Sequence, residues 1–328
     1  MSGASRRLNT IRAGIRDALR RTLSQERRTE LKRWQGVARK RLAPVLSLVH
    51  GTFSAQALRA EIERILPQDF EILMVHSSYD GLLPMYAGNV NELLSVLLAV
   101  CGPYRTLVMP AFIIGGRTFD TRTYFKARPF DIRRTPSEMG LLTEAFRRTP
   151  GVMRSLHPTC SICALGPLAA ELTTGHHLAR TGLGPDGPFG VMTRRTTAIL
   201  GLGVEYFRCL THVHTATNEL GDAFPIKFAK ASTTVTLVDY DGKKIEHELG
   251  LPDRSRKLDL RVLWSLLAKD ELVEWRYHGV PMFMVPRAGV VTERLVEAAS
   301  RGVTIYGRVS VDGDDRSAPP QPATESEP

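Results

Sequence analysis

The chain lacks long apolar runs and is poor in cysteine, and both shortages exclude classes of protein. No stretch of about 18 apolar residues occurs among the 328 residues, so no segment is predicted to span a bilayer. The four cysteines lie between Cys101 and Cys209, and no apolar signal core precedes them. This usage is typical of reduced thiols and disfavours a secreted disulfide framework. We therefore expect a cytoplasmic protein.

Acidic residues are scarce at the start of the chain. Residues 1–48 carry thirteen lysines and arginines against three acidic residues, which accounts for the whole net charge of +10. Apolar residues recur among them at helical spacing, so residues 1–50 are predicted to form a basic amphipathic helical extension. Peripheral contact with the inner membrane surface and a solvated helix both stay open. Nucleic acid is not an expected partner, because aromatic residues are not interleaved with the basic ones. The oligomeric state is not predicted.

The body of the chain alternates between strand and helix patterns. Residues 71–78 and 106–112 read as buried strands, and the segment between them has helical periodicity from Asn89 to Gly102. A parallel strand connection follows from this order. A hairpin is expected about Asp241 and Gly242, and a helix from Pro136 to Arg148 with Thr135 as its cap.

These patterns predict an α/β fold. We expect a single domain over residues 51–308, in which helices flank a mostly parallel central sheet and a β-hairpin is inserted. The polar, proline-rich residues 309–328 are predicted to be a disordered tail.

Two clusters of histidine and cysteine raise the question of zinc. The stretch RSLHPTCSICALG contains His157, Cys160 and Cys163, and RCLTHVHTATNE contains His212 and His214. In an extended segment Cys160 and Cys163 point to opposite sides, so they cannot share a ligand shell. His212 and His214 would share a face, but two ligands do not make a tetrahedral site. We expect no metal.

The first of these clusters belongs to a longer motif. The segment from Arg134 to Gly166, RTPSEMGLLTEAFRRTPGVMRSLHPTCSICALG, closely resembles the aminoglycoside 3-N-acetyltransferase family. Four further stretches support the resemblance in order: VHSS at 75–78, GLGPDGPFG at 182–190, GLGV at 201–204 and THVH at 211–214. The likeness covers residues 71–225 well. It implies a compact α/β fold of this type and acetyl-CoA-dependent acyl transfer to an amino sugar, without a metal.

Acylation of an amine by a thioester requires a base. Sugar amines are largely protonated near neutrality, and a histidine can accept the proton without a large pKa shift. The resemblance gives this role to His214 and places His157 in the acyl-CoA and substrate cleft. Family members typically carry an acidic residue three positions after the base, where this chain has Thr217. Glu219 replaces that carboxylate only if the local backbone is irregular, and Glu205 and Asp222 are further candidates.

The cofactor-binding residues are expected in three motifs. The VHSS turn ends a strand, where its hydroxyls can bind pantetheine or polarise the thioester carbonyl. The start of the helix after residue 134 and nearby arginines can bind the CoA phosphates. The expected residues are His76, Ser77, Ser78, Thr135, Ser137, Met139, Arg154 and Ser161. His176 and His177 read as polar loop histidines.

The acceptor and the class of function stay open. The substrate is either an aminoglycoside antibiotic or an amino sugar of a cell-surface glycan or secondary metabolite. The neutral body favours the second, because a polycation requires many carboxylates. The alternative is a non-catalytic relative that binds CoA as a binding or scaffold protein, and Thr217 supports it. A zinc hydrolase is disfavoured by the ligand spacing.

Overall fold

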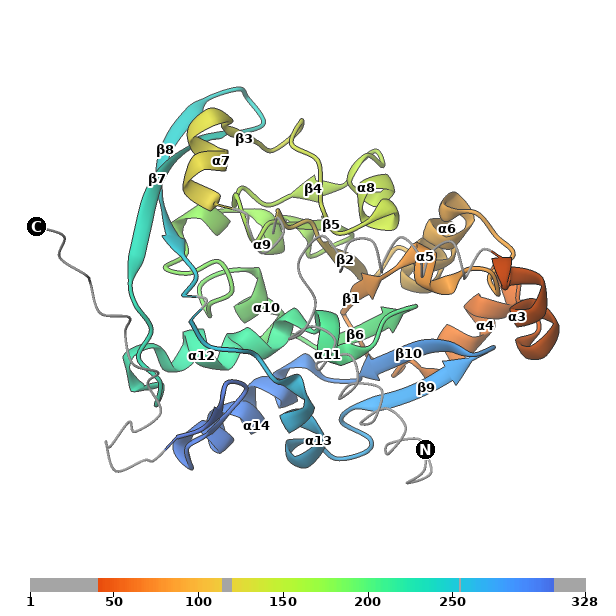
Figure 1. The fold of residues 1–328 in the computed structure, drawn as a ribbon. Coiled ribbons are helices and arrows are strands. Elements are labelled where there is room, and N and C mark those ends of the chain that lie inside the picture. Colours follow the sequence, from red (N-terminus) through yellow and green to blue (C-terminus); the bar gives the residue numbers. More distant parts are fainter. Residues whose placement is uncertain (1–40, 114–119, 254, 310–328) are drawn as a thin grey trace, which may run out of the picture.

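A seven-stranded sheet forms the centre of the computed structural model, which describes residues 41–113, 120–253 and 255–309 (Figure 1). The strand order is β4-β5-β2-β1-β6-β10-β9. Parallel pairing is confined to β2-β1-β6, and the two outer strands on each side are antiparallel to their neighbours. The strands are β1 (Ile72–Ser77), β2 (Thr106–Pro110), β4 (Met153–Arg154), β5 (Ile162–Leu165), β6 (Thr197–Leu202), β9 (Val273–Tyr277) and β10 (Val280–Val285).

The expected strand, helix, strand unit is confirmed. Helix α6 (Val90–Cys101) joins β1 to β2, and these two strands pair in parallel with Ile72 opposite Thr106. The Asn89 side chain accepts hydrogen bonds from the first turn of α6, and the Glu92 side chain bonds back to the Asn89 backbone. This capping box satisfies N–H groups that a helix start otherwise leaves unpaired.

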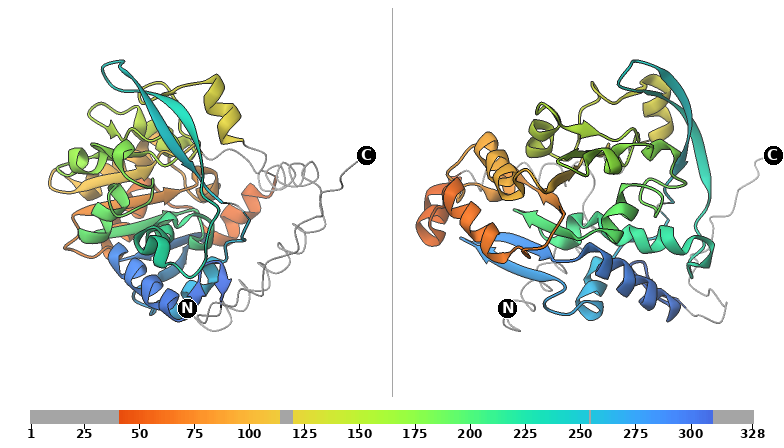
Figure 2. Two further views of the ribbon diagram at one scale, coloured as in Figure 1. Left: turned by 90° about the vertical axis from the view of Figure 1, so that its left-hand side faces the viewer. Right: turned by 180° about the vertical axis from the view of Figure 1, so that it is seen from behind.

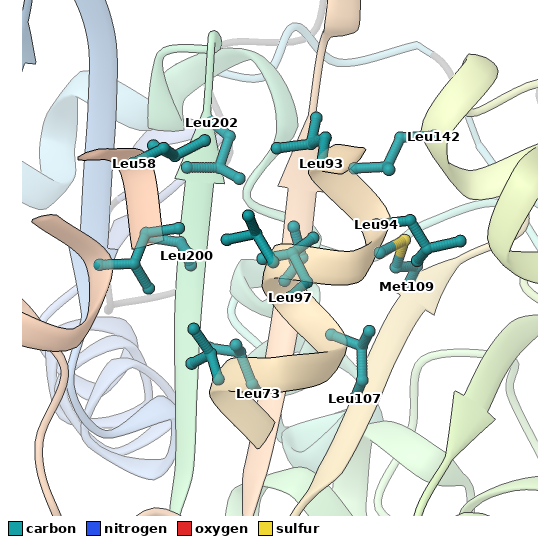
Figure 3. Close-up of a cluster of buried hydrophobic side chains, with 14 of the residues drawn as sticks. Leu58, Leu73, Leu93, Leu94, Leu97, Leu107, Met109, Leu142, Leu200 and Leu202 are labelled. Atoms are coloured by element: carbon teal, nitrogen blue, oxygen red, sulfur yellow. The ribbon is translucent and has the colours of Figure 1, made fainter. Parts of the chain in front are cut away.

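Alternate strand residues divide the core between two faces of the sheet. Leu73 and Val75 lie on the first face, and Ile72 and Met74 on the second. Figure 3 shows leucines of α6 and of the neighbouring strands packed together on the first face. That face is covered by α4 (Ala55–Ile65), α6 and α8 (Leu141–Arg147). The second is covered by α9 (Ala169–Thr173), α10 (Pro188–Arg194), α13 (Leu263–Leu266) and α14 (Ala288–Ser300).

The chain order of these helices places a switch point between β1 and β6. Helix α6 leaves β1 on the first face, whereas α9 and α10, which precede β6, pack on the second. In an open α/β sheet a ligand is expected at such a point, outside the carboxyl ends of the strands. The predicted α/β class is thus confirmed. A ligand site is expected at the carboxyl ends of β1 and β6.

The expected hairpin is present and belongs to a separate three-stranded sheet. β7 (Ala231–Val238) and β8 (Lys244–Leu251) pair antiparallel, and β7 also pairs with β3 (Phe130–Asp131). Gly242 lies in the turn at φ +82°, a conformation that glycine adopts without steric cost. Figure 2 shows the hairpin along one side of the molecule, next to α7 (Thr121–Ala127). A small core of its own lies beneath it.

The helix expected from Pro136 begins five residues later. α8 starts at Leu141 because Gly140, at φ +102°, is not helical. Thr135 to Gly140 instead form a turn segment, in which the Ser137 N–H donates to the Glu144 carboxylate. The prediction of a Thr135 cap at this helix is therefore wrong.

The structure describes only part of the chain on either side of the predicted domain boundaries. α3 (Ala43–His50) is described and has no buried residue, whereas residues 1–40 and 310–328, with most of the expected extension and the tail, lie outside the described residues. The boundaries at 50 and 308 stay predictions. Within residues 41–113, 120–253 and 255–309, no helix combines the length and apolarity needed to cross a bilayer.

Candidate active site

Three of the sequence motifs meet at one edge of the central sheet. β1 ends at Ser77 and the parallel β6 ends at Leu202, and the Ser78 N–H donates to the Leu202 carbonyl at 2.9 Å. β2 ends beside them, and the Ala111 N–H that follows it donates to the Ser161 carbonyl. VHSS and GLGV therefore follow the carboxyl ends of β1 and β6, and the RSLHPTCS loop packs beside the carboxyl end of β2.

The VHSS turn places its three predicted residues differently. His76 points to the second face, is 4% exposed and stacks on Phe283, and burial lowers its pKa to about 4. Ser77 ends the strand half-buried. The Ser78 hydroxyl accepts a hydrogen bond from the Gly81 N–H at 3.0 Å, so its own proton stays available for donation. The turn thus offers hydroxyl groups at the switch point, while His76 lies inside.

Arg154 and Ser161 hold the motif together from inside. The Arg154 guanidinium, in a side chain with 2% exposure, donates to the carbonyls of Thr135 and Ala111 and to the Ser161 hydroxyl. The Ser161 hydroxyl donates in turn to the Ala111 carbonyl. With its donors bound to buried protein atoms, Arg154 is not available to CoA phosphates. Its prediction as a cofactor residue is corrected to a structural role, and the same holds for Ser161.

The predicted residues before α8 are also bonded locally. The Thr135 hydroxyl accepts from the Asp131 N–H, and the Ser137 hydroxyl accepts from the Met139 N–H. Met139 is half-buried against the second face. The fixed segment leaves Arg134, whose side chain is 89% exposed, as a nearby cation that can reach an anionic ligand.

His157 is buried at the same sheet edge. Its Nδ1 accepts from the Cys160 N–H at 3.0 Å, so the proton of the neutral ring is on Nε2. Burial lowers its pKa well below the usual range, and neighbouring histidines add to the shift. A Cβ on Gly182 would lie 2.7 Å from Cε1 and Nε2 of this ring. The GLGPDGPFG stretch therefore packs directly on His157.

His176 is not the polar loop histidine that the sequence suggested. It is 1% exposed, and its ring lies 4.7 Å from that of His157. Its Nε2 contacts the Gly182 carbonyl at 2.9 Å, and its Nδ1 contacts the Ser155 hydroxyl at 2.8 Å. Because a carbonyl only accepts, Nε2 carries the proton and Nδ1 accepts from Ser155. The ring fixes the Gly182 loop over His157.

His212 and His214 do not share a face, because residues 211–214 form a 3-10 helix, η2 (Thr211–His214). His212 is 2% exposed, and its Nε2 contacts the hydroxyls of Thr193 and Thr292. The Thr193 hydroxyl already donates to the Phe189 carbonyl, so the His212 ring is the donor. Burial lowers the pKa of His212 to about 3. His212 is a neutral core histidine.

His214 lies at the end of η2, directly before α12 (Thr215–Leu220), and is half-buried. The Asn218 side chain donates to its backbone carbonyl at 2.7 Å. Its Nδ1 lies 3.5 Å from the Tyr306 hydroxyl. Burial lowers the pKa of His214 to about 4, so the ring is neutral near pH 7.

The structure does not bring Glu219 to His214. The local backbone is a regular helix, Glu219 is exposed, and no described carboxylate contributes to the lowered pKa of His214. Glu205 pairs with Arg208, and Asp222, at 89% exposure, pairs with Lys230. The prediction of Glu219 as the supporting carboxylate is corrected on these grounds.

The cysteines of the RSLHPTCSICALG stretch separate as expected. Cys163 lies in the core of the first face and Cys160 packs against the second. Their thiols therefore face different sides of the sheet.

A family model for aminoglycoside 3-N-acetyltransferase matches residues 74–277, which include all five sequence motifs. The chain belongs to the aminoglycoside 3-N-acetyltransferase family. The match begins within β1 and ends at β9, and so covers the three parallel strands and the hairpin.

Family relatives match this chain in sequence over about half its length. The aminoglycoside N(3)-acetyltransferase IX of Micromonospora chalcea is 27% identical over 164 residues, which are 47% of this chain and 58% of that relative. The chain thus spans little more than half the length of this curated relative.

Solved structures of the family share the fold. A structure of AAC-IIIb, binary with CoASH, superposes with a TM-score of 0.63 at 20% identity, covering 79% of this chain and 99% of that one. A structure of AAC-VIa bound to sisomicin gives a TM-score of 0.61 at 20% identity, covering 75% and 97%.

The family's sequence pattern does not point to Tyr306. This residue lies between β11 (Val303–Thr304) and β12 (Gly307–Arg308), beyond the matched range, yet its hydroxyl is the group that approaches His214 Nδ1. No spacing rule links residues 92 positions apart in the chain, so sequence reasoning had no signal for this contact.

Proposed function

We propose that this protein is an acetyl-CoA-dependent N-acetyltransferase that acetylates an amino group of an amino sugar, with His214 as the general base. The observation that supports this most is the neutral, half-buried His214 ring within the THVH motif of the matched family range. A base must be unprotonated before it can act, and burial of His214 secures that state.

The residues present fit a CoA thioester. The Ser78 hydroxyl keeps a proton to donate, Ser77 adds a second hydroxyl, and Arg134 is an exposed cation for a phosphate. The thioester supplies an activated acyl group. Ser77 and Ser78 donate toward its carbonyl oxygen, which gains charge in the transition state. His157 and His176 hold the GLGPDGPFG loop in place from below.

The transfer makes one C–N bond and breaks one C–S bond. The amine nitrogen attacks the carbonyl carbon, His214 Nε2 accepts the proton that the nitrogen loses, and the thiolate leaves with the C–S electron pair. The proton then passes from the imidazolium to the thiolate, so the base is neutral again at the end of the cycle.

For the acceptor, we favour an amino sugar of a cell-surface glycan or secondary metabolite over an aminoglycoside antibiotic. The AAC-VIa relative is bound to sisomicin. In this chain, however, no described carboxylate influences His214, so the base has no negative charge that would attract a polycation.

The test is release of free thiol from acetyl-CoA in the presence of a panel of amino sugars and aminoglycosides. We expect turnover with at least one monoamino sugar and its loss in His214→Ala. His50→Ala is the matched control, because His50 is an exposed histidine on α3. Turnover that persists in His214→Ala would contradict the assignment of the base.

The second candidate is a CoA-binding relative without turnover. Thr217 and the exposed Glu219 favour it, since His214 has no carboxylate partner among the described residues. Binding of acetyl-CoA measured by calorimetry, with no thiol release on any amine, would place this candidate ahead.

We also propose that the protein is cytoplasmic and contacts an anionic membrane through residues 1–48. The excess of basic residues there supports this, as does α3, on which Leu48 is 87% and Val49 is 69% exposed. We expect co-sedimentation with vesicles that contain phosphatidylserine but not with pure phosphatidylcholine vesicles. Leu48→Asp should weaken it, and Leu178→Asp, at another exposed leucine (77%), should not.

A further inference from the structure

The group next to the proposed base is a tyrosine from the far end of the described chain. The Tyr306 hydroxyl lies 3.5 Å from His214 Nδ1. Thr217, one helical turn after His214, has no charge, and burial is the cause of the lowered pKa of His214. The ring nitrogen that a carboxylate would orient therefore faces a phenol.

The position of Tyr306 is fixed by packing and by its own turn. Its ring lies 5.0 Å from that of Phe228 in an edge-on arrangement, and Phe224 adds a second edge-on contact at 6.4 Å. Its backbone N–H donates to the buried Thr304 hydroxyl, which itself donates to the Gly307 carbonyl. A side chain held in this way can fix the orientation of a neighbour.

The base is held from its backbone side as well. The Asn218 amide donates to the His214 carbonyl, and Val213 and Ala216 on either side are buried in the core of the second face. The remaining freedom of the imidazole is rotation of its ring and the choice of tautomer. A hydrogen bond at Nδ1 settles both.

We propose that Tyr306 is the positioning residue of His214: the phenol oxygen accepts the proton of Nδ1, which leaves Nε2 free to accept a proton from the acceptor amine. This inference rests on the proposed function. Tyr306 takes the place of the acidic residue that this chain lacks at position 217, and it does so from a different element.

The charges around the pair agree with this assignment. Burial raises the pKa of the Tyr306 phenol, and Asp253 raises it further, so the phenol stays neutral while it accepts the hydrogen bond. The nearby Thr217 hydroxyl lowers the phenol pKa, but it is a smaller effect than burial. The His214 and Tyr306 pair is therefore neutral, unlike an imidazole paired with a carboxylate.

The first test is kinetic. We expect Tyr306→Phe to lower kcat by about 10- to 100-fold with KM for the amine nearly unchanged, because only the base is misoriented. Adding Thr217→Glu to Tyr306→Phe should recover most of the loss, since a carboxylate then orients Nδ1. Tyr104→Phe, at an 89% exposed tyrosine, is the control and should leave kcat unchanged. A Tyr306→Phe enzyme with full kcat, or one that Thr217→Glu does not rescue, would overturn the proposal.

The second test does not require turnover. Nitrogen-15 NMR of the imidazoles, with His214 assigned through His214→Ala, should show the Nδ1–H tautomer in the wild type and a mixture or the Nε2–H tautomer in Tyr306→Phe. A wild-type ring protonated on Nε2 would refute the inference even in an active enzyme. If the wild type has the Nδ1–H tautomer but shows no turnover, the proposed function is wrong and the hydrogen bond between Tyr306 and His214 is still supported.

Discussion

At the scale of single residues, Arg154 connects segments that are distant in the sequence. Its guanidinium donates to carbonyls of Thr135 and Ala111, and it also lies 4.8 Å over the Phe130 ring. Lysine has the charge but not the planar fork that reaches two carbonyls at once. An arginine at position 154 is therefore needed to hold the segments at Thr135 and Ala111 together.

We expect Arg154→Lys to destabilise the protein by about 3 kcal/mol, because buried carbonyls lose their donors. Urea unfolding measures this difference. Arg134→Lys, at a side chain with 89% exposure, is the control and should leave stability unchanged. If Arg154→Lys kept full stability and lost only acetyl-CoA affinity, the cofactor role predicted from the sequence would be restored.

Gly182 is a second residue whose size matters. A Cβ at this position would meet the His157 ring at 2.7 Å and the Cys160 Cβ at 2.8 Å. We expect Gly182→Ala to displace His157 and to lower acetyl transfer by at least about tenfold, since small displacements at a site are costly. Gly250→Ala is the matched control, because nothing lies within 4 Å of its added Cβ. Equal thiol release by both variants would contradict the packing argument.

Site residues could be predicted from the sequence where they belong to one contiguous motif, but not where their role depends on a residue far away in the chain. His214 and the Ser77–Ser78 turn could be singled out from contiguous motifs; the structure has the serines at the end of β1 and His214 at the end of η2. The buried role of Arg154 and the approach of Tyr306 depend on contacts across 43 and 92 positions. Such contacts follow from topology and not from periodicity.

At the scale of elements, the β7 and β8 hairpin has its own core. Leu237 is fully buried there, packed with Phe130, Val235 and Leu249, apart from the two cores of the central sheet. We expect Leu237→Ala to destabilise this layer by about 2–5 kcal/mol. Hydrogen exchange should then increase in β3, β7 and β8 while β1 stays protected.

The control for this experiment is Thr234→Ala, at an exposed position on the face of β7 opposite Leu237. Increased exchange throughout β1 and β6 in Leu237→Ala would show that the hairpin is not a separate cooperative unit. The result bears on function because His247 of β8 lies 6.1 Å, ring to ring, from His157.

Elements with local signals were predicted well, and those set by tertiary bonds were not. α6 has a capping box and a terminal glycine, both readable in the sequence. α8 begins after Gly140 because the Glu144 carboxylate accepts a hydrogen bond from the Ser137 N–H, and because the Glu138 N–H donates to the carbonyl of Phe112, two residues after β2. Cap residues at Thr135 and Glu138 gave the same local pattern as a helix start, and the tertiary bonds decided against it.

At the scale of the whole molecule, buried histidines make the stability of the fold depend on pH. Five histidines near the sheet have lowered pKa values, with burial as the first cause in each case: His76, His157, His176, His212 and His214. They are neutral when folded, whereas in the unfolded chain they titrate near pH 6.5. The unfolded state therefore binds more protons than the folded state below that pH.

The sign of the effect follows from this difference. Stability from these histidines is fully present above about pH 6.5 and falls as the pH decreases, by up to about 1.4 kcal/mol per pH unit for each histidine. Carboxylates with lowered pKa values, such as Glu144 at about 2, lose their contribution only at lower pH. The window between pH 6.5 and 5 thus reports mainly on the histidines.

We expect the free energy of unfolding, measured in urea, to drop steeply between pH 7 and 5.5. In His212→Gln, which keeps a side-chain donor for Thr193 and Thr292, the slope should be lower by about one proton. His50→Gln, on the exposed face of α3, should have the wild-type slope. A free energy that is flat over this range, or an unchanged slope in His212→Gln, would mean that His212 is charged in the folded protein, and the neutral donor assigned to it from the threonine contacts would be wrong.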